Sequence, residues 1–194
     1  MARRMPAARQ KAAIVEAAIA IAEERGWEQV RLHEVAERLS LALTDIHAQF
    51  RDLDAVANAW FDQALDATLA VPPSQIEERA PPERLEIVIM RWFEALATHK
   101  SVSGQMLSGK LYPSHPHHWV PMIFDLSRLI HWFLDAARIR STGRRRQLAE
   151  IGLTLIFLAT LRVWLRDDTP DLADTRHVLA RRLQAADRWL ARAV

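Results

Sequence analysis

The chain has 194 residues, a formal net charge of +2 and no cysteine. A chain of this length buries roughly 70% of its unfolded surface, so it needs no disulfides, and the absence of cysteine excludes disulfides and thiolate metal sites. Scarce glycine predicts an all-helical protein. The missing cysteine fits the reducing cytoplasm, and because no apolar stretch follows Met1, no signal peptide is predicted.

Apolar residues recur at helical spacing between positions 14 and 61 and predict three short helices followed by the start of a fourth. Gly26 is expected to end the first helix, and a tight corner near Ser40 separates the second from the third. Two short helices across a tight corner, braced by a longer one, form a helix-turn-helix unit. The side chains expected to anchor its third helix on the first two are Leu43, Ile46, Ala48 and Phe50.

The remaining chain is expected to form a larger helical body. Asp52 is predicted to cap a fourth helix from Leu53 to about Leu69, and Pro72 and Pro73 end it. Further helices are expected to begin near Pro81, Val102, Trp119, Arg144 and Pro170. The longest apolar run stops at Arg162 and is shorter than the roughly 20 residues that cross a membrane, so no membrane span is predicted.

The N-terminal stretch contains an alanine pair in its first helix, a glycine after it, a Val-Ala pair in the second helix and a phenylalanine that ends the third: Ala17, Ala18, Gly26, Val35, Ala36 and Phe50. In these residues it resembles the DNA-binding domain of the TetR family of bacterial transcriptional regulators, with His47 where the family usually has tyrosine. The departures are Ser40 for the turn glycine, Ala42 for the hydroxyl residue that caps the recognition helix, Arg31 for the threonine that opens the second helix, and Leu53 for a lysine at a phosphate.

The resemblance implies a TetR-like, all-α fold of about nine helices and no enzymatic activity. Residues 1–52 would form the helix-turn-helix domain, and residues 53–194 the ligand-binding and dimerisation domain. A homodimer would then bind a palindromic operator in double-stranded DNA, most often as a repressor, under the control of a small apolar ligand or lipid.

Six residues are candidate DNA contacts: Lys11, Arg31, Thr44, Asp45, His47 and Arg51. The charge of this region opposes strong binding, because in residues 1–70 eight Lys or Arg face eleven Asp or Glu, a balance of −3. The third helix carries no Lys or Arg, whereas phosphate neutralisation supplies most non-specific DNA affinity. The alternative is that these residues decorate a solvated three-helix bundle.

Aromatic and methionine side chains in the body suggest a ligand cavity between helices, formed by Trp92, Phe93, Met106, Trp119, Met122 and Phe133. The alternative is an ordinary core. The last two helices are apolar enough to pair with a second copy in a four-helix interface, and the alternative there is a monomeric interior. The residues expected at that interface are Leu155, Leu158, Leu161, Leu179, Leu183 and Leu190.

We expect no metal site, no cofactor and no set of catalytic residues. His115, His117 and His118, even with His99 or His131, do not offer the converging ligands that zinc needs. The run from Val163 to Pro170, with the segments that follow it, also resembles the lipid-binding accessory proteins of ubiquinone biosynthesis, which share the TetR fold. That second resemblance implies an alternative function in which a lipid is bound and DNA is not.

Overall fold

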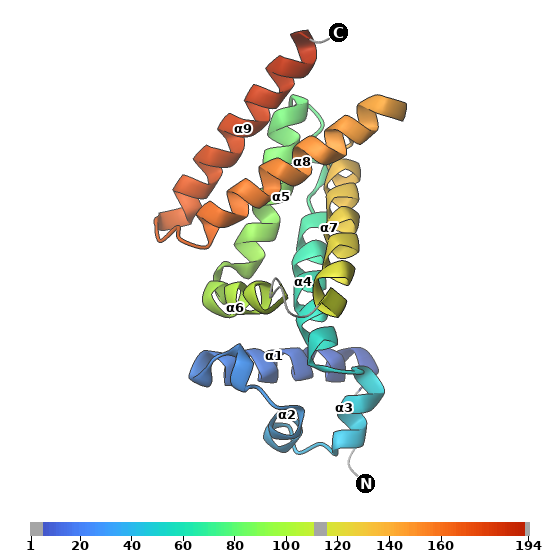
Figure 1. Cartoon of the computed structure of the whole chain (residues 1–194), viewed down its shortest axis with the longest axis vertical. Coiled ribbons are helices and arrows are strands. Elements are labelled where there is room, and N and C mark those ends of the chain that lie inside the picture. The colour runs from blue at the N-terminus through green and yellow to red at the C-terminus, as the bar shows by residue number, and fades with distance from the viewer. Residues whose placement is uncertain (1–5, 111–115, 193–194) are drawn as a thin grey trace. The chain divides into compact units, whose positions relative to one another are not determined.

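The computed structural model describes residues 6–110 and 116–192, with side chains placed throughout these ranges except at 109–110, 116–124 and 190–192. Its described part contains nine α-helices, three short 3-10 helices and no strand, which confirms the all-α prediction (Figure 1). The α-helices are α1 Ala7–Arg25, α2 Leu32–Arg38, α3 Leu43–Gln49, α4 Leu53–Leu69, α5 Pro81–Ala97, α6 Lys100–Lys110, α7 Pro116–Ala136, α8 Gly143–Trp164 and α9 Ala173–Arg192. The 3-10 helices are η1 Trp27–Gln29, η2 Pro73–Gln75 and η3 Pro170–Leu172.

The chain folds into two compact units. Unit 1 comprises residues 1–63 and 99–110, and unit 2 comprises residues 64–98 and 111–194. Helix α6 therefore packs with the N-terminal helices, although α5 precedes it in the sequence. The predicted boundary between residues 52 and 53 separates a DNA-binding part from the rest, and it stays a prediction. The division by packing differs, because unit 1 also contains most of α4 and all of α6.

Unit 1 is built on a small bundle in which α1, α2 and α3 contact one another (Figure 1). Ile14, Ala18 and Val35 have no exposed surface, while Ile46 of α3 and Phe50, directly after α3, are 0% and 3% exposed. These positions match the predicted helical spacing, because residues three and four apart share one helix face.

The expectation that Leu43 and Ala48 also anchor α3 is wrong. Leu43 is 52% exposed, and Ala48 is exposed as well. Leu43 lies in the first turn of α3 and does not pack against the core cluster of unit 1. Exposed residues therefore occur in both the first and the last turn of α3, while Ile46 between them is buried.

The corner between α2 and α3 has the hydrogen bonds of a Schellman motif. The Leu41 N–H donates to the Ala36 carbonyl at 2.9 Å, and the Ser40 N–H donates to the Glu37 carbonyl at 3.0 Å. The motif requires a left-handed residue, and Ser40 supplies it with φ of 53°. Ser40 thus replaces the glycine of the family pattern without changing the path of the chain.

Helix α6 is tied to the rest of unit 1 by polar contacts. The Trp27 backbone N–H donates to Gln105 Oε1 at 2.7 Å, and Trp60 Nε1 donates to Ser103 Oγ at 2.9 Å. Val102 and Met106 of α6 are both 2% exposed and belong to the core of unit 1. The end of α1, the segment after it and α4 are therefore all held by α6.

Unit 2 is held together by α5, α7, α8 and α9, in which α8 packs against α7 and α9, and α5 against α7 and α9 (Figure 1). Its centre is a cluster of buried aromatic rings, with Phe93 stacked on Phe157 at a centroid distance of 5.5 Å. The members of this cluster are Trp92, Phe93, Phe133, Phe157 and Trp164.

The corner between α8 and α9 is organised by Asp167, which is 4% exposed. Its Oδ2 accepts hydrogen bonds from the Thr175 backbone N–H at 2.8 Å and from the Thr175 hydroxyl at 2.6 Å, and its Oδ1 accepts from the Thr169 backbone N–H and hydroxyl. Burial raises the pKa of Asp167, but the hydrogen bonds from Thr169 and Thr175 outweigh it and lower the pKa to about 2.

Helix α8 is, within the described part of the chain, the one helix long and apolar enough to cross a membrane, with a mean hydropathy of 1.4. This departs from the sequence prediction, which counted only the uninterrupted apolar run. Length and composition of a single helix are a weak indication of membrane crossing. An apolar helix that packs on both sides in a water-soluble assembly has the same composition.

Candidate nucleic-acid interface

The exposed side of α3 is formed by Leu43, Thr44, His47 and Ala48. At 100° per residue these four positions span about 140° of the helix circumference, opposite the half-buried Asp45 and Gln49. Ile46 and Phe50 fix the helix from the other side by burial in the core of unit 1. Two of the predicted DNA contacts, Thr44 and His47, therefore point away from the protein on a common surface.

Asp45 has a structural role that the sequence analysis missed. Its Oδ2 accepts a hydrogen bond from the Ala42 backbone N–H at 3.1 Å, which satisfies a donor at the start of α3. This is the reciprocal half of a capping box, and it operates although Ala42 has no side-chain oxygen of its own. Asp45 thus partly replaces the missing cap, and a carboxylate engaged in this way is a poor partner for a phosphate.

The end of α3 lies beside two cations. Lys11 on the exposed side of α1 places its Nζ 5.6 Å from the centre of the Phe50 ring. Arg51 follows Phe50 directly, is exposed, and contacts the Asp52 carboxylate at 3.1 Å. Asp52 itself caps α4, since its Oδ1 accepts the Ala55 N–H at 2.7 Å, as predicted. Lys11 and Arg51 therefore bring positive charge to one end of α3.

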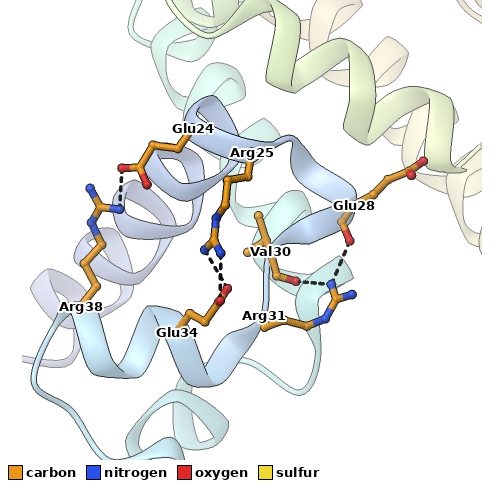
Figure 2. A network of polar contacts seen from close by, with 7 residues as sticks. All are labelled: Glu24, Arg25, Glu28, Val30, Arg31, Glu34 and Arg38. Atoms are coloured by element: carbon orange, nitrogen blue, oxygen red, sulfur yellow. Dashed lines mark hydrogen bonds and ion pairs between the residues drawn. The ribbon is translucent and has the colours of Figure 1, made fainter.

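Arg31 behaves differently from the other candidate contacts. Its Nη1 donates to the Glu28 carbonyl at 2.8 Å and to the Val30 carbonyl at 2.9 Å, as Figure 2 shows. The side chain thereby closes the segment that joins α1 to α2. Its first role is structural, so an Arg31 substitution would disturb unit 1 as well as any DNA contact.

Other arginines of α1 and α2 are engaged by carboxylates (Figure 2). Arg25 forms two hydrogen bonds with the Glu34 carboxylate, at 3.1 and 3.0 Å, and Arg38 contacts Glu24 at 2.8 Å. The hydrogen bonds from Arg25 lower the pKa of Glu34 below its ordinary value of 4.5. These ion pairs connect α2 to α1. They account in part for the excess of acidic over basic residues in this region, because Glu24 and Glu34 have a structural role.

The residues predicted to line a ligand cavity fall into both units. Trp92, Phe93 and Phe133 are at most 3% exposed and pack in the aromatic cluster of unit 2, whereas Met106 belongs to the core of unit 1. The side chains of Trp119 and Met122 lie outside the described residues. The Trp164 indole N–H, missed by the sequence analysis, is buried in the aromatic cluster with no hydrogen-bond partner among the described side chains and backbone.

The residues predicted at a dimer interface divide by exposure. Leu155 and Leu158 on α8 are 64% and 40% exposed, and Leu161 is half-buried. Leu179 and Leu183 on α9 are 0% and 4% exposed because they pack inside unit 2, so they are not available to a second copy. The Leu190 side chain lies outside the described residues. The exposed apolar stripe on α8 continues instead through Leu148 and Ile151.

No group of three metal-binding side chains comes together in residues 6–110 and 116–192 wherever side chains are placed. His99 contacts Glu23 in unit 1 at 2.6 Å, and His131 contacts Glu150 in unit 2 at 3.1 Å. His115 and the side chains of His117 and His118 lie outside the described residues.

A helix-turn-helix joined to a larger helical unit is the arrangement of a transcriptional regulator, and comparisons with solved structures identify the family. The chain is 34% identical to the TetR transcriptional regulator from Nitrosomonas europaea ATCC 19718, with a TM-score of 0.81 over 92% of this chain and 98% of that one. The chain therefore belongs to the TetR family of transcriptional regulators.

More distant structures share the fold. A TetR transcriptional regulator from Rhodococcus sp. RHA1 is 22% identical with a TM-score of 0.62, over 90% of this chain and 96% of that one. A transcriptional regulator from Aquifex aeolicus VF5 is 18% identical with a TM-score of 0.56, over 91% and 98%. No protein-family profile matches the chain, and no curated protein sequence does.

The resemblance of the C-terminal third to lipid-binding accessory proteins gains no support from these comparisons. The residues of that run have a local explanation instead. Asp167, Thr169 and Thr175 form the hydrogen-bonded corner that joins α8 to α9.

Proposed function

We propose that this protein is a cytoplasmic, DNA-binding repressor that works as a homodimer on a palindromic operator. The observation that carries the proposal is the exposed side of α3, where Thr44 and His47 face solvent on a helix anchored by Ile46 and Phe50. In a helix-turn-helix the second helix enters the major groove, and its N-terminal residues contact base edges. Lys11 and Arg51, at the other end of α3, supply charge for the phosphates.

Binding of the full chain to duplex DNA from the region upstream of its own gene tests the proposal, with fluorescence anisotropy as the measurement. We expect saturable binding that weakens as salt rises from 50 to 200 mM, because phosphate contacts release counterions. An unrelated duplex of equal length is the control. Equal affinity for both duplexes, or no binding at 50 mM salt, would remove the basis for a sequence-specific regulator.

We propose that the homodimer forms through α8 and α9. Support comes from the four exposed leucine and isoleucine side chains on α8, at positions 148, 151, 155 and 158, spaced three and four residues apart as one continuous stripe. Trp189 on α9 is 61% exposed. A two-fold interface covers such a stripe with the same stripe of a second copy, and the resulting helix bundle is a common way for soluble chains to pair.

We propose that a small apolar effector binds in unit 2 and lowers operator affinity by shifting the population of dimers away from the DNA-binding spacing. The aromatic cluster supports an apolar site, and the buried Trp164 N–H supports an acceptor on the ligand, since an unsatisfied buried donor costs about 1–3 kcal/mol. Thermal unfolding in the presence of a panel of apolar carboxylic acids, ketones and phenols tests this. We expect a stabilising compound to release operator DNA; a compound that stabilises without releasing DNA would exclude this form of control.

A further inference from the structure

The exposed side of α3 is rich in methyl groups and poor in long hydrogen-bonding side chains. Leu43, Thr44 and Ala48 each end in or carry a methyl group, and the fourth member of this surface is His47. Guanine is most often read by Arg or Lys and adenine by Asn or Gln, each through two hydrogen bonds. None of the four exposed residues can make such a pair of bonds.

Among the side chains of unit 1 that the structure describes, Leu43 is the most exposed large apolar one, at 52%. A single exposed leucine is ordinary on a protein surface. This one differs by its place, because it is the first residue of α3, and the N-terminal residues of a recognition helix reach base edges. Leu43 also stays outside the core cluster, so the fold does not require its size.

Resting on the proposed function, we infer that Leu43 contacts the C5-methyl group of a thymine in the operator. Apolar side chains discriminate thymine in the major groove through that methyl group. The half-site is then read mainly through thymine methyls beneath Leu43, while Thr44 and His47 supply single hydrogen bonds. Guanine, which needs a long donor on α3, contributes little to recognition under this helix.

The test begins by selecting operators from a randomised duplex library with the full-length protein. Each thymine of the selected half-site is then replaced by uracil, which removes only the C5-methyl group. We expect one replacement to weaken binding roughly fourfold, since burying one methyl-sized group contributes about that factor, and roughly 15-fold when both half-sites are changed. The other thymine-to-uracil replacements should have smaller effects.

The matched protein variant is Leu43→Ala. Alanine suits a helix, and position 43 lies outside the core, so circular dichroism should show an unchanged fold. We expect Leu43→Ala to bind the thymine operator more weakly and to lose its preference for thymine over uracil. His47→Ala should bind more weakly overall and keep that preference.

Two outcomes overturn the inference, and they are distinguishable. If the protein selects a sequence but no uracil replacement affects the wild type more than Leu43→Ala, the thymine contact is wrong while the regulator proposal stands. If no sequence is enriched and binding is absent at 50 mM salt, the proposed function fails and the inference fails with it.

Discussion

At the scale of single residues, Ser40 shows how a departure from the family pattern is accommodated. It occupies a left-handed backbone conformation, with φ of 53°, at the end of α2. For a residue with a Cβ atom this conformation costs roughly 1–2 kcal/mol, whereas glycine adopts it without that penalty. The hydrogen bonds of the corner hold Ser40 in place, so the strain is stored rather than relieved.

Replacing Ser40 by glycine should therefore raise the free energy of unfolding, by about 0.5 kcal/mol. The relief of roughly 1 kcal/mol of strain exceeds the extra entropy that glycine gives the unfolded chain, about 0.5 kcal/mol. Urea denaturation measures the change. The control is Ser40→Ala, which removes the hydroxyl but keeps Cβ; if it stabilises as much as glycine, backbone strain is not the cause.

Asp167 makes stability depend on pH in the acid range. Its native pKa of about 2 lies below its ordinary value of 3.8, so the carboxylate contributes its full stabilisation above about pH 5 and loses it as pH falls toward 2. The shift corresponds to about 2 kcal/mol. We expect Asp167→Asn to unfold more easily than the wild type by about that amount at pH 7, with the difference shrinking toward pH 2. A difference that stays constant between pH 7 and pH 3 would contradict the assigned hydrogen bonds.

At the scale of the element, the proposed recognition helix α3 lies apart from the charges that would attract DNA. The helix itself carries no Lys or Arg, and the exposed cations near it come from α1 and from Arg51. Arg25, Arg31 and Arg38 are engaged in holding α1 and α2 together. The number of phosphate contacts should thus be small, and base contacts should contribute a larger share of the binding free energy.

The salt dependence of operator binding should reflect this small number. Arg9 is a further exposed cation on α1, close in sequence to Lys11. If Arg9, Lys11 and Arg51 of each protomer contact phosphates, the proposed dimer makes about six such contacts, and the slope of log affinity against log salt should be about −5. Lys11→Met keeps an unbranched side chain beside Phe50 and removes the charge at Nζ, so it should reduce the slope by about 2. The control is Arg140→Met, an exposed site in unit 2, which should leave the slope unchanged.

At the scale of the whole molecule, α8 is apolar on two sides. Leu153, Phe157 and Trp164 are buried within unit 2, while Leu148, Ile151, Leu155 and Leu158 are exposed. One chain can cover only the first group. The second group adds to the high hydropathy of the helix, and the dimer proposed above would cover this group from the other side.

If the homodimer forms through α8 as proposed, Leu155→Glu should convert it to a monomer, because the interface would have to bury an unpaired carboxylate. Position 155 is 64% exposed in the single chain, so the protomer should still fold. Sedimentation velocity should show at least a 100-fold weaker dimer, and operator binding should fall because two half-sites are no longer linked. Leu155→Met, which keeps an apolar side chain of similar size, should remain dimeric. A dimeric Leu155→Glu protein would move the interface away from α8.

The sequence by itself determined the helices, their order and the family. Local signals set the helix ends: Asp52 caps α4, Pro81 opens α5, and Gly26, with φ of 90°, follows α1. Such signals act between residues close in the chain, so a single sequence contains them. The periodicity of the first three helices likewise identified Ile46 and Phe50 as core residues.

Only the tertiary structure decided which apolar residues stay uncovered. Leu43 and Ile46 lie three residues apart in α3, yet Leu43 is 52% exposed and Ile46 is 0% exposed. Leu179 and Leu183 turned inward, whereas Leu155 did not, and α6 joined the N-terminal helices. Burial depends on what packs against a helix from elsewhere in the chain, and a residue's spacing within its own helix carries no information about those distant partners.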